Sequence, residues 1–217
     1  LYGDAHTRNS SSDFLYGNAS TGPVFLFENG WRIHTFLTAE TGFADYDFLF
    51  WSAGLGGTIE TRGTDPLRSI TGVVSYADFS NTNSSGTFNA EPGRDAVVYG
   101  LSARLGWDSV FAKVDGIEIR PSVIYNDAAK SRFTFLQAGV TASYAISVLS
   151  FAGGVGNVYL SPEITVQYRD YEGQEPGRNT ERHDWRVSPA VRLIAMYDNY
   201  TAVLGYMYDR NFSNYNN

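Results

Sequence analysis

One alternating run near the C-terminus, residues 185–197, constrains the fold more than any other stretch. Every second residue is apolar or aromatic, whereas the residues between them include Arg186, Ser188 and Arg192. Because successive side chains of a β-strand point to opposite faces, the run predicts a strand with one apolar and one polar face. A strand of this length spans roughly 40 Å, and tilted by about 45° it covers about 28 Å, close to the hydrocarbon thickness of a bilayer.

The residues after this run predict a hairpin. Asp198-Asn199 is a turn signal, and residues 200–208 then alternate again. Aromatic rings stand at both ends of each run, as in the interfacial girdles of membrane barrels. We therefore interpret residues 185–208 as a transmembrane β-hairpin.

The rest of the chain fits the same class. No apolar run approaches the roughly 18–20 residues of a membrane helix, and no composition shift divides the chain, so residues 1–217 are predicted to be one domain. Residues 1–22 are polar and predicted to be a loop. Strands are predicted over 23–28, 31–40, 47–62, 68–79, 97–113, 117–126, 132–148, 157–169, 185–197 and 200–208.

The predicted connections fall into two kinds that alternate along the chain. Those at 41–46, 81–96, 127–131 and 171–183 are long and polar, whereas those at 29–30, 63–67, 114–116, 149–154 and 198–199 are shorter. Outer-membrane barrels have long extracellular loops and short periplasmic turns. The pattern therefore predicts an all-β, antiparallel transmembrane β-barrel in a bacterial outer membrane, in contact with its lipid. A soluble sandwich or a lipid-binding barrel is the alternative.

Strand parity adds a further expectation. About ten strands would start and end on the long-loop side, whereas bacterial barrels have both termini on the periplasmic side. The chain is therefore predicted to be an incomplete part of a barrel of about 12 or more strands, with strands missing at both ends. A miscounted strand is the alternative. Pro121, Pro162 and Pro189 lie inside predicted strands and indicate either bulges or strand breaks there.

The alternation divides the candidate residues between two faces. Residues predicted to line a lumen, where they either brace the wall or contact a polar solute, are Arg32, His34, Glu40, Glu60, Arg62, Arg104, Asp108, Glu118, Arg120, Glu163, Arg169, Arg186, Arg192 and Asp209. Residues predicted to form the membrane girdles are Trp31, Trp107, Tyr168, Trp185, Tyr197, Tyr200 and Tyr208. In the closing hairpin, Trp185 and Tyr208 are expected at the outer girdle.

Composition and motifs exclude several function classes. A net charge of -7 disfavours nucleic acid as a partner, and the absence of cysteine excludes disulfide and thiolate chemistry. No metal-spaced cluster or phosphate loop occurs, so neither a metal nor a cofactor is predicted. No catalytic residue is assigned and an enzyme is not expected. His183-Asp184 resembles the Asp-His pair of omptin surface proteases, so an outer-membrane barrel hydrolase is a minor alternative.

The sequence also resembles a broad family in style. The features concerned are the tyrosine-rich strand ends, the x-Pro-x-aliphatic strands and the ending Tyr-Met-Tyr-Asp-Arg-Asn-Phe-Ser-Asn-Tyr at 206–215. These are similar to the barrel domains of envelope export proteins, such as surface lipoprotein assembly modifiers and exopolysaccharide-export porins. The resemblance implies a barrel of 14 or 16 strands that moves a polymer or lipoprotein, together with other envelope or export proteins.

Two functions follow as expectations. The first is a channel or export barrel that passes a polar solute, polymer or lipoprotein across the outer membrane. The second is a structural or adhesive surface barrel with a closed lumen, whose loops 81–96 and 171–183 form the contact surface.

Overall fold

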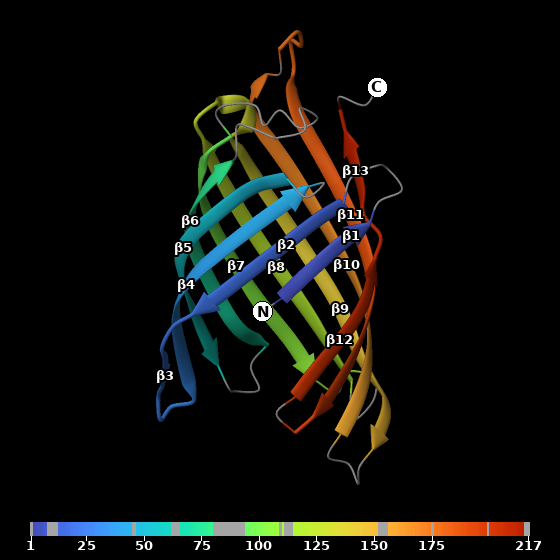
Figure 1. The fold of residues 1–217 in the computed structure, drawn as a ribbon. Helices are drawn as coiled ribbons and strands as arrows, with labels where there is room; N and C mark the ends of the chain where they lie inside the picture. Colours follow the sequence, from blue (N-terminus) through green and yellow to red (C-terminus); the bar gives the residue numbers. More distant parts are fainter. Residues whose placement is uncertain are drawn as a thin grey trace.

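The structure, a computed structural model, describes residues 2–7, 13–44, 47–61, 66–79, 94–108, 110, 115–151, 156–174, 176–198 and 200–214. All of its strands belong to one antiparallel sheet (Figure 1). They are β1 (Tyr2–Thr7), β2 (Asp13–Thr21), β3 (Val24–Leu26), β4 (Trp31–Ala44), β5 (Asp47–Thr61), β6 (Leu67–Phe79), β7 (Ala96–Asp108), β8 (Asp115–Ala128), β9 (Phe135–Phe151), β10 (Gly156–Gln174), β11 (Glu181–Tyr197), β12 (Tyr200–Met207) and β13 (Arg210–Ser213). A 3-10 turn, η1 (Ser131–Phe133), precedes β9. Within these ranges, no helix is both long and apolar enough to cross a membrane.

Two pairs of segments each continue as one strand. β2 and β3 pair with β4 in a single register, interrupted at residues 22–23. In the same way, β12 and β13 pair with β11 in one register across residues 208–209. The sheet is therefore a simple meander in which each strand lies beside the next one in the sequence.

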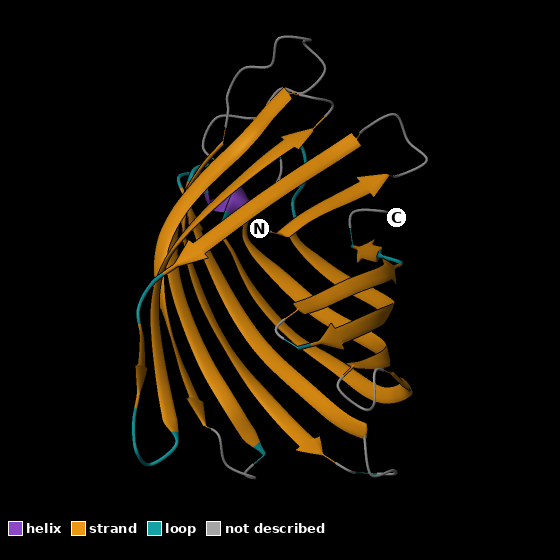
Figure 2. Cartoon of the chain, turned by 60° about the horizontal axis from the view of Figure 1, so that its bottom comes forward, coloured by secondary structure: helices purple, strands orange, loops and turns teal. Residues whose placement is uncertain are grey.

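The sheet curls but does not close. Figure 2 shows the strands wrapping into a trough, with β1 at one edge and the β12–β13 strand at the other. Among the described residues no ladder joins these two edges. The all-β, antiparallel class is thus confirmed, whereas closure into a barrel stays a prediction.

The N-terminal segment corrects the predicted strand count. Residues 1–22 were expected to be a loop, but β1 and β2 lie within them and pair with each other. β2 also pairs with β4, where Gly17 lies opposite Thr41 and Asn18 opposite Glu40. Small and polar residues carry no strong strand signal, so here sheet pairing overrides local propensity. The strand predicted to come first corresponds to β2 and β3. Because β1 precedes β2 and runs antiparallel to it, the prediction that the first strand begins on the long-loop side is wrong.

The predicted sorting of connections is also wrong in part. β4 runs to Ala44 and β5 begins at Asp47, so the connection expected to be long is as short as that at 198–199. The segment 171–183 lies mostly in strands, since β10 extends to Gln174 and β11 begins at Glu181. The longest connection is 80–95, and the β10–β11 hairpin rises at the same end, at the top of Figure 1. We call this the 80–95 end and the opposite one the 198–199 end.

Local turn chemistry agrees with the sequence at two hairpins. Residues 198–199 join β11 to β12, Tyr197 lies opposite Tyr200, and Asp198 adopts φ 50°. Positive φ at the first position of a two-residue hairpin loop suits the twist of the strands. At residues 27–30, the amide of Gly30 donates to the carbonyl of Phe27 at 3.1 Å, and Gly30 has φ 84°. By contrast, Gly116, expected in a turn, lies in β8 opposite Asp108.

The three strand prolines cause neither bulges nor breaks. Each keeps its strand in register and interrupts the ladder to one neighbour only. The β7–β8 ladder is interrupted beside Pro121, the β9–β10 ladder beside Pro162, and the pairing of β11 with the β12–β13 strand beside Pro189. Proline has no N–H to donate, so a one-sided interruption is its minimal effect on a ladder. Register shifts occur elsewhere, for example between Val158 and Tyr159.

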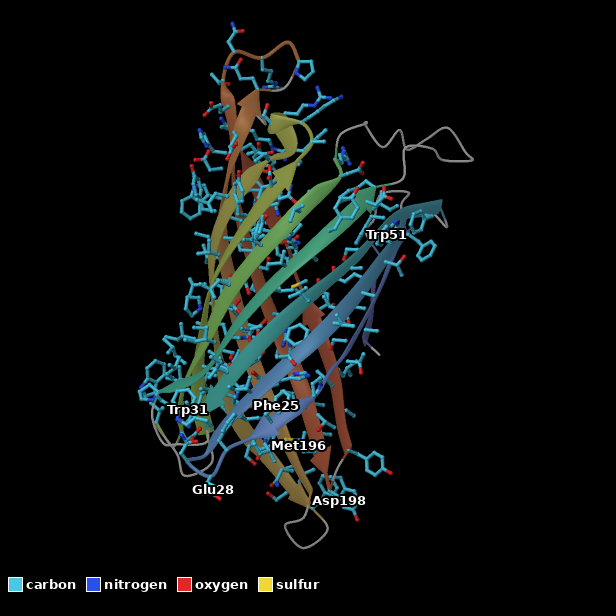
Figure 3. All side chains as sticks on the ribbon, turned by 90° about the vertical axis from the view of Figure 1, so that its left-hand side faces the viewer. Phe25, Glu28, Trp31, Trp51, Met196 and Asp198 are labelled. Atoms are coloured by element: carbon cyan, nitrogen blue, oxygen red, sulfur yellow. The ribbon has the colours of Figure 1, made fainter. Side chains whose placement is uncertain are left out.

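The two faces of the sheet reverse the usual distribution of polarity. Leu37, Leu55 and Leu101 are about 60% exposed, at 64%, 63% and 58%. The buried side chains, in contrast, are mainly polar and include Ser52, Gln137, Ser161, Asp184 and Ser188. The polar face is therefore the less accessible, inner side of the curl, and the apolar face lies outside. Figure 3 shows the outward-facing Trp31 and Trp51 near opposite ends of the sheet.

Candidate functional site on the polar face

The charged residues predicted to face inward share one side of the sheet, which we call the polar face. Arg32 lies opposite Glu60, and Glu118 and Glu163 both lie opposite Ser143. Directly opposed residues of an antiparallel pair point to the same side. The residues placed there by register are Arg32, His34, Glu40, Glu60, Arg104, Asp108, Glu118, Arg120, Glu163, Arg169, Arg186, Arg192 and Asp209. Arg62 lies outside the described residues, and a lumen role for the others stays a prediction.

A row of ion pairs crosses the middle of this face, and we call it the arginine–glutamate ladder. It consists of Arg104, Glu118, Arg120, Glu163 and Arg192. The Glu118 carboxylate lies 3.2 Å from Nε of both Arg104 and Arg120. The Glu163 carboxylate lies 2.5 Å from Nη2 of Arg120 and 2.9 Å from Nη2 of Arg192. The Glu163 side chain is only 7% exposed, so these two arginines must compensate its charge.

The ladder passes over β9, which contributes no charge to it. The residues of β9 beneath it are Thr141 and Ser143, opposite Arg120 and Glu163 respectively. β8 and β10 lie two strand spacings apart, about 9–10 Å. Short side chains on the intervening strand leave room for Arg120 to reach Glu163. The arginine–glutamate ladder thus links β7, β8, β10 and β11 across β9, whose side chains at this level are polar and small.

The remaining predicted residues make weaker or single contacts. Arg32 lies 3.4 Å from Glu60, with both side chains about one-third exposed, and Glu40 accepts a hydrogen bond from Ser52 at 3.3 Å. His34 contacts the ring of Phe36, at 5.2 Å between centroids. Asp108 pairs with Arg68 at 2.7 Å. We did not predict Arg68 as a site residue, because its place in the alternation is set by the register shift between Leu67 and Ser69.

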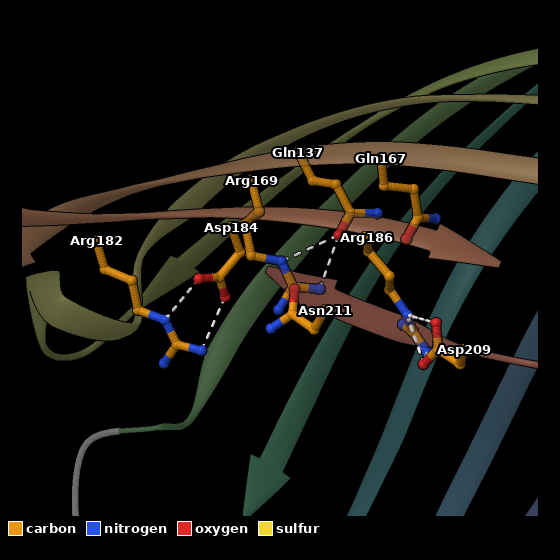
Figure 4. Close-up of a pocket in the computed structure, with 8 residues that line it drawn as sticks. All are labelled: Gln137, Gln167, Arg169, Arg182, Asp184, Arg186, Asp209 and Asn211. Carbon is orange, nitrogen blue, oxygen red and sulfur yellow. Dashed lines mark hydrogen bonds and ion pairs between the residues drawn. The ribbon is translucent and has the colours of Figure 1, made fainter. Parts of the chain in front are cut away.

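A second group, which we call the upper polar cluster, lies on β9, β10, β11 and the β12–β13 strand toward the 80–95 end, and Figure 4 shows it in close-up. It lines a pocket of about 230 Å³ and consists of Gln137, Gln167, Arg169, Arg182, Asp184, Arg186, Asp209 and Asn211. Arg186 binds Asp209 through Nε at 2.7 Å and Nη2 at 2.5 Å. Ser188 donates a further hydrogen bond to Asp209 at 2.7 Å. This geometry brings together the predicted residues Arg169, Arg186 and Asp209.

The other carboxylate of the upper polar cluster is Asp184. Arg182 binds it through Nε at 3.0 Å and Nη2 at 2.8 Å. Burial raises the pKa of Asp184, but hydrogen bonds from Arg182 and Ser213 outweigh burial and lower the pKa below its ordinary value. Sequence reasoning did not assign Arg182 and Asp184 to the polar face, because it began the strand at residue 185 and considered Asp184 only together with His183, whereas β11 begins at Glu181. The alternation of Arg182, Asp184 and Arg186 was the signal that could have found them.

The predicted girdle residues lie on the opposite, apolar face and form two rows. Trp31, Trp107, Tyr197 and Tyr200 lie toward the 198–199 end. Tyr168 and Trp185 lie toward the 80–95 end, with ring centroids 4.9 Å apart. Tyr208, expected at the outer girdle with Trp185, lies level with Pro189 instead, and Phe212 of β13 lies opposite Trp185. The row at the 80–95 end also includes the contacting pairs Trp51–Tyr76 and Tyr99–Tyr125.

The polar tips of three aromatic residues in this row bind polar side chains, two of which lie beyond the row. Trp51 Nε1 donates to Asp78 at 3.1 Å, and Tyr125 Oη donates to Glu172 at 3.2 Å. Tyr168 Oη lies 3.2 Å from Nδ1 of His183. Glu172 and His183 each lie two residues farther toward the 80–95 end than the ring they bind, whereas Asp78 lies directly opposite Trp51. Between the two rows, the described residues of the apolar face include one charged side chain, Arg210 at the sheet edge, whose guanidinium carbon lies 4.8 Å from the centroid of the Phe212 ring in the row.

The His-Asp pair considered for a hydrolase does not form. His183 lies 2.7 Å from Asp170 on one face, whereas Asp184 binds Arg182 on the other. Neighbouring residues of a strand point to opposite faces, so a sequence-adjacent pair of this kind cannot act together. In the described part of the chain, no group of three or more His, Asp or Glu residues is arranged to hold a metal ion.

Comparison with known proteins gives no relative from which a role could be transferred. No protein-family model matches the sequence, and no curated protein is significantly similar to it. The function must therefore be argued from the two faces of the sheet.

Proposed function

We propose that this chain forms all or part of a transmembrane β-barrel of a bacterial outer membrane, and that its polar face lines a passage for polar solutes. The observation that carries the proposal is the inverted polarity of the sheet. Leu37, Leu55 and Leu101 are exposed, while Ser52, Ser161 and Ser188 are buried. An exposed apolar surface that extends along a whole sheet requires a nonpolar environment, and a bilayer is the environment that fits a curled sheet.

The aromatic rows support a bilayer rather than a protein partner. Tyrosine and tryptophan concentrate at membrane interfaces because the ring is apolar and the tip is polar. At the 80–95 end, the tips of Tyr125 and Tyr168 bind polar groups beyond the row, and the tip of Trp51 binds Asp78 within it. This orientation is the one expected of a girdle residue at the edge of the hydrocarbon.

The polar face supports a passage rather than a filled interior. In small closed barrels, large side chains from opposite walls meet and fill the lumen. Here the large polar-face side chains pair along the wall, as in the arginine–glutamate ladder, above small residues such as Thr141 and Ser143. The polymer or lipoprotein cargo that the family resemblance implies would use the same passage.

Refolded protein in planar lipid bilayers is expected to give discrete conductance steps. Ser122 lies on the polar face opposite Gly139, and its neighbour Val123 lies on the apolar face and is 46% exposed. The variant Ser122→Trp should lower the step size, because the indole enters the passage, whereas Val123→Trp should leave the step unchanged.

Circular dichroism and single-channel recording test this expectation together. Folded, membrane-inserted protein that gives no steps would contradict a passage and favour the structural or adhesive barrel with a closed lumen. Equal conductance of both tryptophan variants would contradict the assignment of the two faces.

A further inference from the structure

Arg169 differs from the other described strand arginines whose side chains lie on the polar face. Each of these lies within 3.4 Å of a carboxylate oxygen; they are Arg32, Arg68, Arg104, Arg120, Arg182, Arg186 and Arg192. The guanidinium of Arg169 instead has neutral partners. Its Nε and Nη2 donate to Gln137 Oε1 at 3.0 and 2.7 Å, and its Nη1 donates to Tyr171 Oη at 3.1 Å.

These neutral contacts hold Arg169 in place without compensating its charge. The ring of Phe135 lies 4.2 Å below the guanidinium carbon, and Gln137 is buried at 5% exposure. The contacts use only part of the guanidinium, so N–H donors on its terminal nitrogens stay open. A fixed guanidinium with open donors binds the planar fork of a carboxylate or the oxygens of sulfate well.

Among the described residues that line the pocket, the charges leave one cation in excess. The upper polar cluster contains the arginines 169, 182 and 186 but only two carboxylates. Asp184 is bound by Arg182, and Asp209 by Arg186 and Ser188. The amides of Gln167 and Asn211 line the same pocket and add neutral hydrogen-bonding groups.

We propose that the upper polar cluster is an oxyanion-binding site centred on Arg169, which takes a carboxylate or sulfate group of a soluble solute. The pocket, about 230 Å³, is large enough for such a group. It opens on the polar face, whereas lipid would meet the apolar face, so a lipid headgroup is not the occupant. The site lies toward the 80–95 end, on the opposite face from Tyr168 and Trp185 and at about their level. Its role at the entrance of a passage rests on the proposed function, whereas anion binding does not.

Calorimetric titration of the detergent-folded protein with sodium sulfate, at constant ionic strength, tests the site directly. Wild-type protein should show saturable binding, and Arg169→Gln should weaken it by about tenfold or more, the size expected for a charge-assisted hydrogen-bonded pair. Lys130→Gln is the control, because it also removes one positive charge near this end but from an exposed residue outside the pocket.

A second variant keeps the arginine and the fold. Gln137→Glu gives Arg169 its own carboxylate, as in the ladder, so it should abolish sulfate binding without loss of stability. Unchanged binding in both Arg169→Gln and Gln137→Glu, or no saturable binding by wild-type protein, would overturn the proposal. Sulfate binding by protein that does not conduct would uphold the site and reject the passage, and conduction without binding would do the reverse.

Discussion

Glu163→Gln is expected to lower the free energy of unfolding by about 2–3 kcal/mol. The carboxylate is nearly buried and joins Arg120 and Arg192, at 2.5 and 2.9 Å. Its neutralisation leaves two arginines without the charge that holds them together. Both arginine side chains are more than one-third exposed, which keeps the loss below that of a fully buried pair. Urea unfolding of the protein in lipid vesicles, followed by tryptophan fluorescence, measures the change.

Glu60→Gln provides the matched control for Glu163→Gln. Glu60 makes one contact with Arg32 at 3.4 Å, and both side chains are about one-third exposed. An exposed single pair of this kind contributes less than about 1 kcal/mol. Equal losses from the two variants would show that the arginine–glutamate ladder does not brace the wall.

Leu101→Arg is expected to cost about 2–4 kcal/mol of stability in vesicles, the range for an arginine facing the middle of a bilayer. Leu101 is 58% exposed on the apolar face and pairs with Gly72 and Val123, between the two aromatic rows. The charge would lie in hydrocarbon, because no described acidic side chain lies on the apolar face between the two aromatic rows to pair with it. Unfolding in vesicles of the same lipid composition as for Glu163→Gln gives the comparison.

The neighbouring variant Ser102→Arg places the same charge on the polar face. Ser102 lies opposite Thr71 and Ser122, both polar. The cost there should stay below about 1 kcal/mol, because lumen substitutions in barrels are well tolerated. A larger cost for Ser102→Arg than for Leu101→Arg would mean that the apolar face does not meet lipid.

The face assignment is the part of the fold that sequence predicts best. Alternation with period two fixes which of Leu101 and Ser102 faces outward, whatever the neighbouring strands are. The turn at 198–199 is equally local, and its prediction is confirmed. Strand ends are not local, since β10 and β11 continue past the predicted loop because they pair with each other. β1 and β2 were missed for the same reason.

The partners of charged residues could not be predicted from the alternation alone. Placing Arg120 beside Glu163 requires the register of β8, β9 and β10 together, and the three strands are set by separate turns. The neutral setting of Arg169 depends on Gln137, which carries no charge signal in the sequence. Phe212, and not the predicted Tyr208, joins Trp185 in the row at the 80–95 end, because the strand continues through residues 208–209. In each case, the face follows from sequence and the contact from register.

Depth-dependent quenching of single labelled cysteines tests most directly whether the apolar face meets lipid. The chain has no cysteine, so one fluorescent label can be introduced at a time. Three adjacent strands offer neighbouring pairs of positions: Leu101 and Ser102 in β7, Val123 and Ser122 in β8, and Val140 and Thr141 in β9. In vesicles, labels at 101, 123 and 140 should be quenched by brominated lipid, and labels at 102, 122 and 141 by aqueous iodide. Quenching that does not alternate, or brominated lipid that quenches 102, 122 and 141 instead, would contradict the membrane assignment.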